Sequence, residues 1–344
     1  MIDLKSIFLP ELKNICRGLG ESEYRANQLY RWIHVSLVRD FSEMTNLPAS
    51  FRERLANDYT LTKLEEAAVK ESALDGTKKF LFSLPDGNRI ESVWMPYRDW
   101  NTACVSSQVG CAMGCAFCAS GIDGCVRNMT AGEILEEVYA VQRCVGQRVT
   151  NVVVMGSGEP FQNYDEVLRF IRLLTDPEGH GMSVRSVTVS TSGIVPGIRA
   201  LAGEGLAVNL AVSLHAPNDD IRRRIMPVAK RYPMEELLSE CRKYFEATHR
   251  LVTFEYALIK DVNDSPEHAG ELAERLKGLP CLVNLIPVNP VKELDFARPG
   301  RKRVVRFKNK LEKMGINGSI RRELGSDIDG ACGQLRRSSR MVRL

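Results

Sequence analysis

The chain has 344 residues, of which 44% are hydrophobic and 26% are charged, a balance that supports a folded core and excludes a disordered chain. At roughly 150 residues per domain, this length predicts two domains or one large α/β domain with an appendage. The N-terminal residues form no signal peptide, and no apolar run reaches the roughly 18 residues of a membrane span. We therefore expect a cytoplasmic protein without a membrane partner.

The formal net charge of +4 hides a strong asymmetry. Residues 296–344 contain 14 Lys and Arg against four Asp and Glu, so the rest of the chain is acidic. This basic stretch predicts either a polyanion-binding surface or a solvated helix face followed by a ragged tail. Charge alone does not decide between the two.

The first 60 residues predict a small helical module, whose second helix is amphipathic through Tyr24, Leu29, Tyr30, Trp32 and Ile33. Two strand-like runs follow, at 79–84 and 89–95. The residues Pro85-Asp86-Gly87-Asn88 between them favour a turn. We expect a β-hairpin that links the module to the main domain.

After residue 97 the chain alternates between strands and helices. We expect strands at 102–106, 151–156, 186–191, 207–214, 252–259 and 281–287. Between and after them we expect helices at 164–175, 195–203, 234–248, 266–278 and 301–314, and a further helix whose capping box is formed by Thr130 and Glu133. Six βα units in a row predict a parallel sheet, open or partly closed into a barrel, with ligands at the carboxyl ends of its strands.

Cys111, Cys115 and Cys118 are spaced Cys-x3-Cys-x2-Cys in a glycine-containing loop after the first of these strands. Three thiolates so close together indicate a metal site. A structural zinc site would need a fourth ligand, which Cys104 could supply, whereas an iron-sulfur cube held by three cysteines leaves one iron open. The spacing leaves both possibilities open.

This spacing, with Phe117 before the last cysteine, resembles the signature of radical S-adenosylmethionine (SAM) enzymes, and the six βα units match their partial barrel. Further motifs are similar to one branch, the dual-specificity 23S rRNA and tRNA adenine-C2 methyltransferases. They are Cys104-Val-Ser-Ser-Gln-Val-Gly-Cys111, Gly158-Glu159-Pro160, Ser190-Thr-Ser-Gly193, Ser213-Leu-His-Ala-Pro-Asn218, Asn284-Leu-Ile-Pro-Val-Asn-Pro290 and Asp327-Ile-Asp-Gly-Ala-Cys-Gly-Gln-Leu335.

The resemblance implies an α/β fold with four parts. They are a helical RNA-binding module over 1–60, a β-hairpin linker over 61–97, a partial (βα)6 radical SAM barrel over 98–318, and a C-terminal segment over 319–344 that carries a catalytic cysteine and a basic tail. It also implies a monomer that modifies 23S rRNA and tRNA and takes electrons from a donor such as flavodoxin or ferredoxin.

The resemblance further implies the cofactors and their ligands. A [4Fe-4S] cluster would be held by Cys111, Cys115 and Cys118, and two SAM molecules would be used in each turnover. The expected SAM contacts are Gly158, Glu159, Ser190, Ser213, Leu214, His215 and Asn289.

In the family, a C-terminal cysteine that matches Cys332 is first methylated, and a radical then abstracts hydrogen from its methyl group. The resulting carbon radical adds to adenine. Glu91 matches the proton acceptor, and Cys104 matches the thiol that forms a transient disulfide with Cys332.

Without the family resemblance, Cys332 could be a plain free cysteine in a glycine-rich setting, and Glu91 could be a charged residue at the edge of a hairpin. Strand alternation places Glu91 on one face with Val93 and Met95, opposite Ile90, Ser92 and Trp94, and a carboxylate on an apolar face is suited to proton transfer.

Two alternatives remain. A sister branch methylates carbon 8 of the same type of adenine and confers antibiotic resistance, but it tends to have Cys at the position of Val109 and Arg at that of Pro287. A non-catalytic, zinc-stabilised RNA-binding protein would use Cys104 with the three clustered cysteines as its zinc ligands.

Two residues depart from the family pattern, which usually has Met at the position of Ser157 and Ala at the position of Gly330. The other cysteines are expected to be small buried residues: Cys16, Cys125, Cys144, Cys241 and Cys281.

Overall fold

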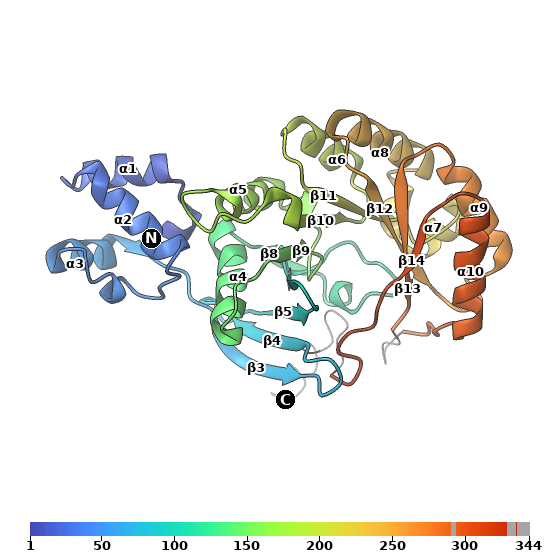
Figure 1. The fold of residues 1–344 in the computed structure, drawn as a ribbon, viewed down its shortest axis with the longest axis horizontal. Helices are drawn as coiled ribbons and strands as arrows, with labels where there is room; N and C mark the ends of the chain where they lie inside the picture. The colour runs from blue at the N-terminus through green and yellow to red at the C-terminus, as the bar shows by residue number, and fades with distance from the viewer. Residues whose placement is uncertain (290–293, 329–334, 336–344) are drawn as a thin grey trace.

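The computed structural model describes residues 1–289, 294–328 and 335. Its centre is one sheet of ten strands in the order β14-β13-β12-β11-β10-β9-β6-β5-β4-β3. The sheet bends into an open arc, and most of the long helices of the main domain lie along its outer side (Figure 1). No helix in the described ranges is both long and apolar enough to cross a membrane.

Seven neighbouring strands of this sheet run parallel. They are β6 (Asn101–Val105), β9 (Asn151–Val154), β10 (Val187–Thr191), β11 (Asn209–Ser213), β12 (Val252–Leu258), β13 (Cys281–Pro287) and β14 (Gly318–Ile320). The first six confirm the strands expected from the sequence, and β14, which was not predicted, adds a seventh. Strands β9, β10 and β13 carry alternating buried and partly buried residues, and β6, β11 and β12 are mostly buried, as expected for a sheet covered by helices. The edge strand β14 is partly exposed.

The helices that cover the sheet are α4 (Ala131–Val145), α5 (Tyr164–Thr175), α6 (Val195–Gly203), α7 (Asp219–Ile225), α8 (Met234–Thr248), α9 (Pro266–Leu276) and α10 (Arg301–Lys313). The predicted capping box of α4 is confirmed, because the Glu133 N–H donates to Thr130 Oγ1 and the Thr130 N–H donates to Glu133 Oε2. The short helix α7 was not predicted.

Three antiparallel strands extend the same sheet on the N-terminal side: β3 (Glu65–Glu71), β4 (Lys78–Ser83) and β5 (Arg89–Pro96). Strands β4 and β5 form the predicted hairpin. The hairpin is more than a linker, since β5 pairs with β6 and places Val93 opposite Cys104. The hairpin and the parallel strands therefore share one hydrogen-bonded surface.

The N-terminal module contains the elements β1 (Ile2–Asp3), α1 (Leu9–Gly18), α2 (Glu23–His34), α3 (Ala49–Asp58) and β2 (Tyr59–Thr60). It docks on α4 through buried polar contacts. Lys5 Nζ lies 2.5 Å from Glu136 Oε2 and donates to the Thr62 carbonyl at 2.6 Å. The approach is close, because a Cβ at Gly132 would lie 2.2 Å from Asp3 Oδ2.

Two buried histidines lie at this same junction. His34 Nδ1 is 2.9 Å from the Tyr139 hydroxyl, and His180 Nε2 is 3.2 Å from Gln142 Oε1. Burial lowers the pKa of His34 to about 3 and that of His180 to about 4. Both rings are therefore neutral in the folded chain above these values.

The junction should make stability sensitive to mild acid. An unfolded histidine takes up a proton near pH 6.5, whereas these folded histidines stay neutral down to about pH 4. Because the unfolded state binds more protons in this window, the free energy of unfolding should fall as the pH drops from 6.5 to 5. Thermal unfolding across this range measures the effect. His34→Gln should flatten the dependence, and His249→Gln, at an exposed position, should not; equal slopes in all three proteins would contradict the assignment.

Candidate active site

A cavity of about 560 Å³ opens at the carboxyl ends of the parallel strands, the position predicted for the ligand site from the sequence. Its wall combines one face of β5, the cysteine loop, the ends of β10 to β13 and the segment after β14. Its lining includes Val93, Met95, Tyr97, Cys118, Ser190, Ser213, His215, Glu255, Pro287, Asn289, Arg298, Arg321, Arg322 and Leu324.

The three clustered cysteines lie in one loop between β7 (Gln108–Gly110) and the short helix η3 (Ala119–Gly121). All three are half-buried, and Cys118 lines the cavity. Burial raises the pKa of Cys111 to about 11, and the nearby Cys118 thiol adds to this shift. Burial also raises the pKa of Cys115, followed in size by the effects of Cys118 and Cys111. The thiols therefore lie within electrostatic reach of one another.

This donor set fits an iron-sulfur cluster better than a closed zinc site. Three soft ligands come from one loop, the number that leaves one iron of a cube open. Cys104, the fourth ligand required by the zinc alternative, packs instead against Val93 and Met95 of β5. Within residues 1–289, 294–328 and 335, no group of three or more His, Cys, Asp or Glu side chains has metal-ligating geometry. Metal binding would also have to displace the thiol protons.

Glu159 joins the loops that follow β9 and β10. Its buried carboxylate accepts hydrogen bonds from the Ser192 N–H at 2.6 Å, the Thr191 hydroxyl at 2.8 Å and the Phe161 N–H at 3.1 Å. Burial raises its pKa, and the bonds from Ser192 and Thr191 oppose that shift. Gly158 has φ +113°, and a Cβ there would clash with Ser107 and Gln108. Glu159 and Gly158 therefore shape this loop, and neither lines the cavity among the described residues.

Ser157, the departure from the family pattern, also has a defined place. Its side chain is buried, and its hydroxyl lies 3.4 Å from that of Ser120 in η3, the short helix that follows the cysteine loop. Its carbonyl accepts from the Ser107 N–H at 2.9 Å. Ser157 therefore connects the loop after β9 with the loop that carries the cluster cysteines.

Four of the expected SAM contacts do line the cavity, namely Ser190, Ser213, His215 and Asn289. His215 has φ +55° two residues after the end of β11, and its Nδ1 accepts from the Ala257 N–H at 2.8 Å. Because a backbone N–H only donates, the neutral ring carries its proton on Nε2. Burial lowers the pKa of His215 to about 3. Leu214 differs from the others, since its side chain is fully buried in the core.

Sequence reasoning missed Glu255, which also lines the cavity. The parallel register places Ser213, Glu255, Asn284 and Ser319 in one row across four strands. Asn284 Nδ2 donates to Glu255 Oε2 at 2.9 Å, and Ser319 Oγ donates to Asn284 Oδ1 at 3.1 Å. The sequence did contain a signal for Glu255, namely a single carboxylate within the otherwise mostly apolar strand Val-Thr-Phe-Glu-Tyr-Ala-Leu.

Glu91 and Cys104 lie on the cavity side of the sheet. Val93 and Met95 both line the cavity and form one buried cluster with Cys104. On the opposite face of β5, Ile90 and Trp94 enter the main core. This confirms the predicted alternation of β5.

One neighbour of Glu91 was not expected. Lys79 Nζ lies 3.2 Å from Glu91 Oε2, and both side chains are buried. The carboxylate that the family resemblance singled out therefore has a buried ammonium group beside it.

The segment after β14 is fixed to the turn between β3 and β4. The Asp327 carboxylate accepts from the Ser72 hydroxyl at 2.6 Å and from the Ala73 N–H at 2.9 Å, and the Gly325 N–H donates to Asp75 Oδ2 at 2.9 Å. Leu324 packs against Val93, Met95 and Cys104. The predicted catalytic residue Cys332 and the departure Gly330 lie outside the described residues.

Of the five cysteines expected to be small buried residues, Cys16, Cys241 and Cys281 are buried and Cys125 is partly buried. The prediction for Cys144 is wrong, because its side chain is exposed and its thiol donates to Glu66 at 3.5 Å. It lies on the last turn of α4, beyond Val141, the last buried residue of that helix.

Comparison with known proteins decides the family. The sequence model of the radical SAM superfamily matches residues 105–273, and that of the ribosomal RNA large subunit methyltransferase N-terminal domain matches residues 2–61. A protein of Lachnospira eligens named "Probable dual-specificity RNA methyltransferase RlmN" is 52% identical over 98% of this chain and 96% of its own length. The chain belongs to the RlmN family of radical SAM methyltransferases.

Further RlmN relatives agree with this assignment. A protein of the same name from Lachnoclostridium phytofermentans is 53% identical over 98% of this chain and 95% of its own length. The crystal structure of a radical SAM methyltransferase from Sphaerobacter thermophilus matches with a TM-score of 0.94 and 47% identity, over 97% of this chain and 99% of that one. The enzyme class expected from the sequence is confirmed, as are its cofactors, a [4Fe-4S] cluster and SAM.

The Lys79–Glu91 pair should behave as a buried ion pair. Lys79→Met removes the ammonium beside a buried carboxylate, and we expect a loss of about 3–5 kcal/mol in the free energy of unfolding. Lys79→Met/Glu91→Gln should recover most of that loss, because the charge that needs compensation is gone. Chemical denaturation compares the proteins. A double variant as unstable as the single one would show that the two charges do not interact.

The Asp327 contacts should determine the order of the segment that leads toward Cys332. Asp327→Ala removes the acceptor for Ser72 and Ala73, so amide hydrogen exchange should increase at Ala73 and Gly325. Asp99→Ala, at an exposed position of another turn, is the matched control. Unchanged exchange at Ala73 in Asp327→Ala would show that the segment is held by its apolar contacts instead.

Proposed function

We propose that the chain methylates carbon 2 of an adenine in 23S rRNA and in tRNA, through an S-methylated Cys332 and a transient disulfide between Cys332 and Cys104. The observation that carries this proposal is the shared face of β5 and β6. Two residues of that face, Val93 and Met95, line the cavity and form one buried cluster with Cys104, and Glu91 precedes them on the same face. A proton acceptor and a second thiol are thus available beside one cavity.

We assign the cluster to Cys111, Cys115 and Cys118, and SAM to the cavity at Ser190, Ser213, His215 and Asn289. Gly158, Glu159 and Leu214 would act mainly through the backbone that they position. When bound, the cluster and SAM supply a one-electron cleavage that ends in abstraction of a hydrogen atom. Carbon 2 of adenine is not nucleophilic, so it cannot simply attack a methyl sulfonium, and this chemistry avoids that obstacle.

The protein's own residues complete the reaction. The Cys332 thiolate attacks the methyl carbon of one SAM molecule and becomes a thioether, while the bond from that carbon to the sulfonium sulfur breaks and S-adenosylhomocysteine leaves. Loss of a hydrogen atom leaves a carbon radical on this group, which bonds to carbon 2 of adenine. The adduct loses the proton at carbon 2 to Glu91 and one electron, for which the cluster oxidised during SAM cleavage would be the acceptor.

Cys104 then releases the product. Its thiolate attacks the Cys332 sulfur, the bond between sulfur and the transferred carbon breaks, and that carbon takes up a proton to become a methyl group. The disulfide must be reduced before the next turnover. We therefore expect the enzyme to act in a reducing cytoplasm, with an electron donor such as flavodoxin or ferredoxin, and as a monomer.

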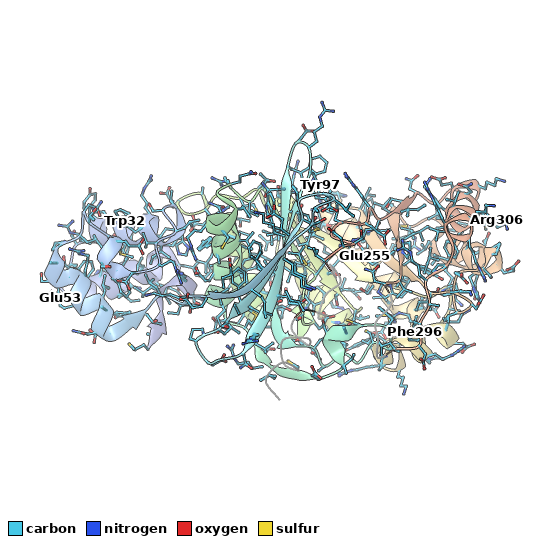
Figure 2. The ribbon with its side chains drawn as sticks, turned by 90° about the horizontal axis from the view of Figure 1, so that it is seen from below. Trp32, Glu53, Tyr97, Glu255, Phe296 and Arg306 are labelled. Carbon is cyan, nitrogen blue, oxygen red and sulfur yellow. The ribbon has the colours of Figure 1, made fainter. Side chains whose placement is uncertain are left out.

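RNA binding would use basic surfaces near and beyond the cavity. Arg301, Lys302 and Arg306 are exposed on α10, whose apolar side packs through Val304 and Phe307. Part of the basic charge is neutralised, because Arg303 lies 2.7 Å from Asp261 and 2.9 Å from Asp264. Arg306 lies at the opposite end of the molecule from Trp32 and Glu53 of the N-terminal module (Figure 2). We propose that an extended RNA substrate contacts both of these ends of the protein.

Two positions favour carbon 2 over carbon 8. Pro287, where the sister branch tends to have Arg, lines the cavity, and Val109, where that branch tends to have Cys, is fully buried on β7. A Pro side chain offers the adenine no charged donor at this position.

The test is incubation of reduced, cluster-loaded protein with an rRNA fragment and SAM that carries a fully deuterated methyl group. We expect 2-methyladenosine whose methyl group holds two deuterium atoms, because one is abstracted. Cys332→Ala should abolish the product, whereas Cys144→Ala, at an exposed thiol, should not. Nucleoside mass analysis against synthetic 2- and 8-methyladenosine reads the result. Three deuterium atoms would exclude the Cys332 route, and 8-methyladenosine would exclude carbon 2.

A further inference from the structure

The turn between β5 and β6 carries two stacked aromatic rings that the proposed reaction does not use. Tyr97 and Trp100 have ring centroids 5.2 Å apart and planes 22° apart. The Tyr97 N–H donates to the Trp100 carbonyl at 2.8 Å, which closes the turn between the two residues. The pair is therefore held in place before any ligand arrives.

The two rings differ in their surroundings. Tyr97 lines the cavity and packs against the cluster of Val93, Met95 and Cys104, whereas the Trp100 side chain is 49% exposed. Tyr97 lies in the central part of the molecule near Glu255, another cavity residue, between the N-terminal module and α10 (Figure 2). The pair therefore leads from the cavity wall to the surface.

The charges around this opening indicate what the exposed ring meets. Arg298, Arg321 and Arg322 line the same cavity, and Arg98 is exposed within the turn itself. Glu323 neutralises Arg298, and Glu255 in the cavity and Asp99 in the turn are also acidic, so the arginines exceed the acidic residues by one. A flat aromatic surface next to cationic side chains matches single-stranded nucleic acid, whose bases stack on aromatic rings while its phosphates contact cations.

We propose that Trp100, supported by Tyr97, is a stacking platform for an unpaired nucleobase adjacent to the target adenine. This inference rests on the proposed RNA methyltransferase function and adds to it a residue that binds the substrate. The target base must leave its helix to reach the cavity, so its neighbours lose stacking partners. Trp100 replaces one of those partners at the entrance.

The expected effect of Trp100→Ala is weaker RNA binding, by roughly five- to a hundredfold in Kd, since base stacking on an aromatic side chain contributes on that scale. The loss should appear in KM rather than in kcat, because the ring contacts a neighbouring base and not the reacting carbon. Trp100→Phe should retain most of the affinity. Leu74→Ala is the matched control, since Leu74 is an exposed apolar side chain on a different turn, the one between β3 and β4.

The decisive experiment is a double-mutant cycle on binding. Wild type and Trp100→Ala are titrated with an rRNA fragment and with fragments in which one nucleotide beside the target adenine is abasic. We expect one abasic position to weaken binding to the wild type while leaving binding to Trp100→Ala unchanged. Equal losses in both proteins at every flanking position would overturn the proposal, as would unaltered affinity in Trp100→Ala.

Indole fluorescence gives a second readout. RNA should quench the wild type more than Trp100→Phe, and the difference should vanish with the fragment that is abasic at the stacked position. Equal quenching of the two proteins would count against the platform. The wild type could show the expected coupling between Trp100 and the flanking base and still form no methyladenosine. In that case the proposed methyltransferase function fails, while the stacking site is supported.

Discussion

The pairing of β5 with β6 is the constraint on which the site depends. This antiparallel contact joins a hairpin to a parallel sheet and places Val93 opposite Cys104. Because side chains alternate along a strand, a shift by one residue would turn Glu91, Val93 and Met95 away from the cavity. The register thus determines whether a carboxylate and a thiol from distant segments can act on one substrate.

Much of the fold could be predicted from local sequence patterns. The six strands and six helices after residue 97 follow from hydrophobic periodicity, and the capping box of Thr130 and Glu133 marked the start of α4. The cluster cysteines could be recognised because the Cys-x3-Cys-x2-Cys spacing lies within eight residues of sequence. The face of Glu91 also followed from strand alternation, which needs no knowledge of the partner strand.

The remaining features depend on contacts between distant segments. Strand β3 was missed because its residues Glu65–Glu71 are mostly charged and exposed, so it lacks the apolar alternation of a strand. The Lys79–Glu91 pair requires the register of β4 on β5. The family pattern suggested Glu159 as a SAM contact. In the structure the Glu159 carboxylate accepts hydrogen bonds from the loops after β9 and β10, and these loops are brought together only when the sheet folds.

The most direct test of the shared site is the fate of RNA in a Cys104→Ala protein. If Cys104 resolves the link between Cys332 and the base, the reduced, SAM-supplied variant should accumulate a covalent protein–RNA adduct on a denaturing gel. Cys104→Ala/Cys332→Ala should form none, since the linking sulfur is absent. Release of free methylated RNA by Cys104→Ala at the wild-type rate would contradict the role of Cys104.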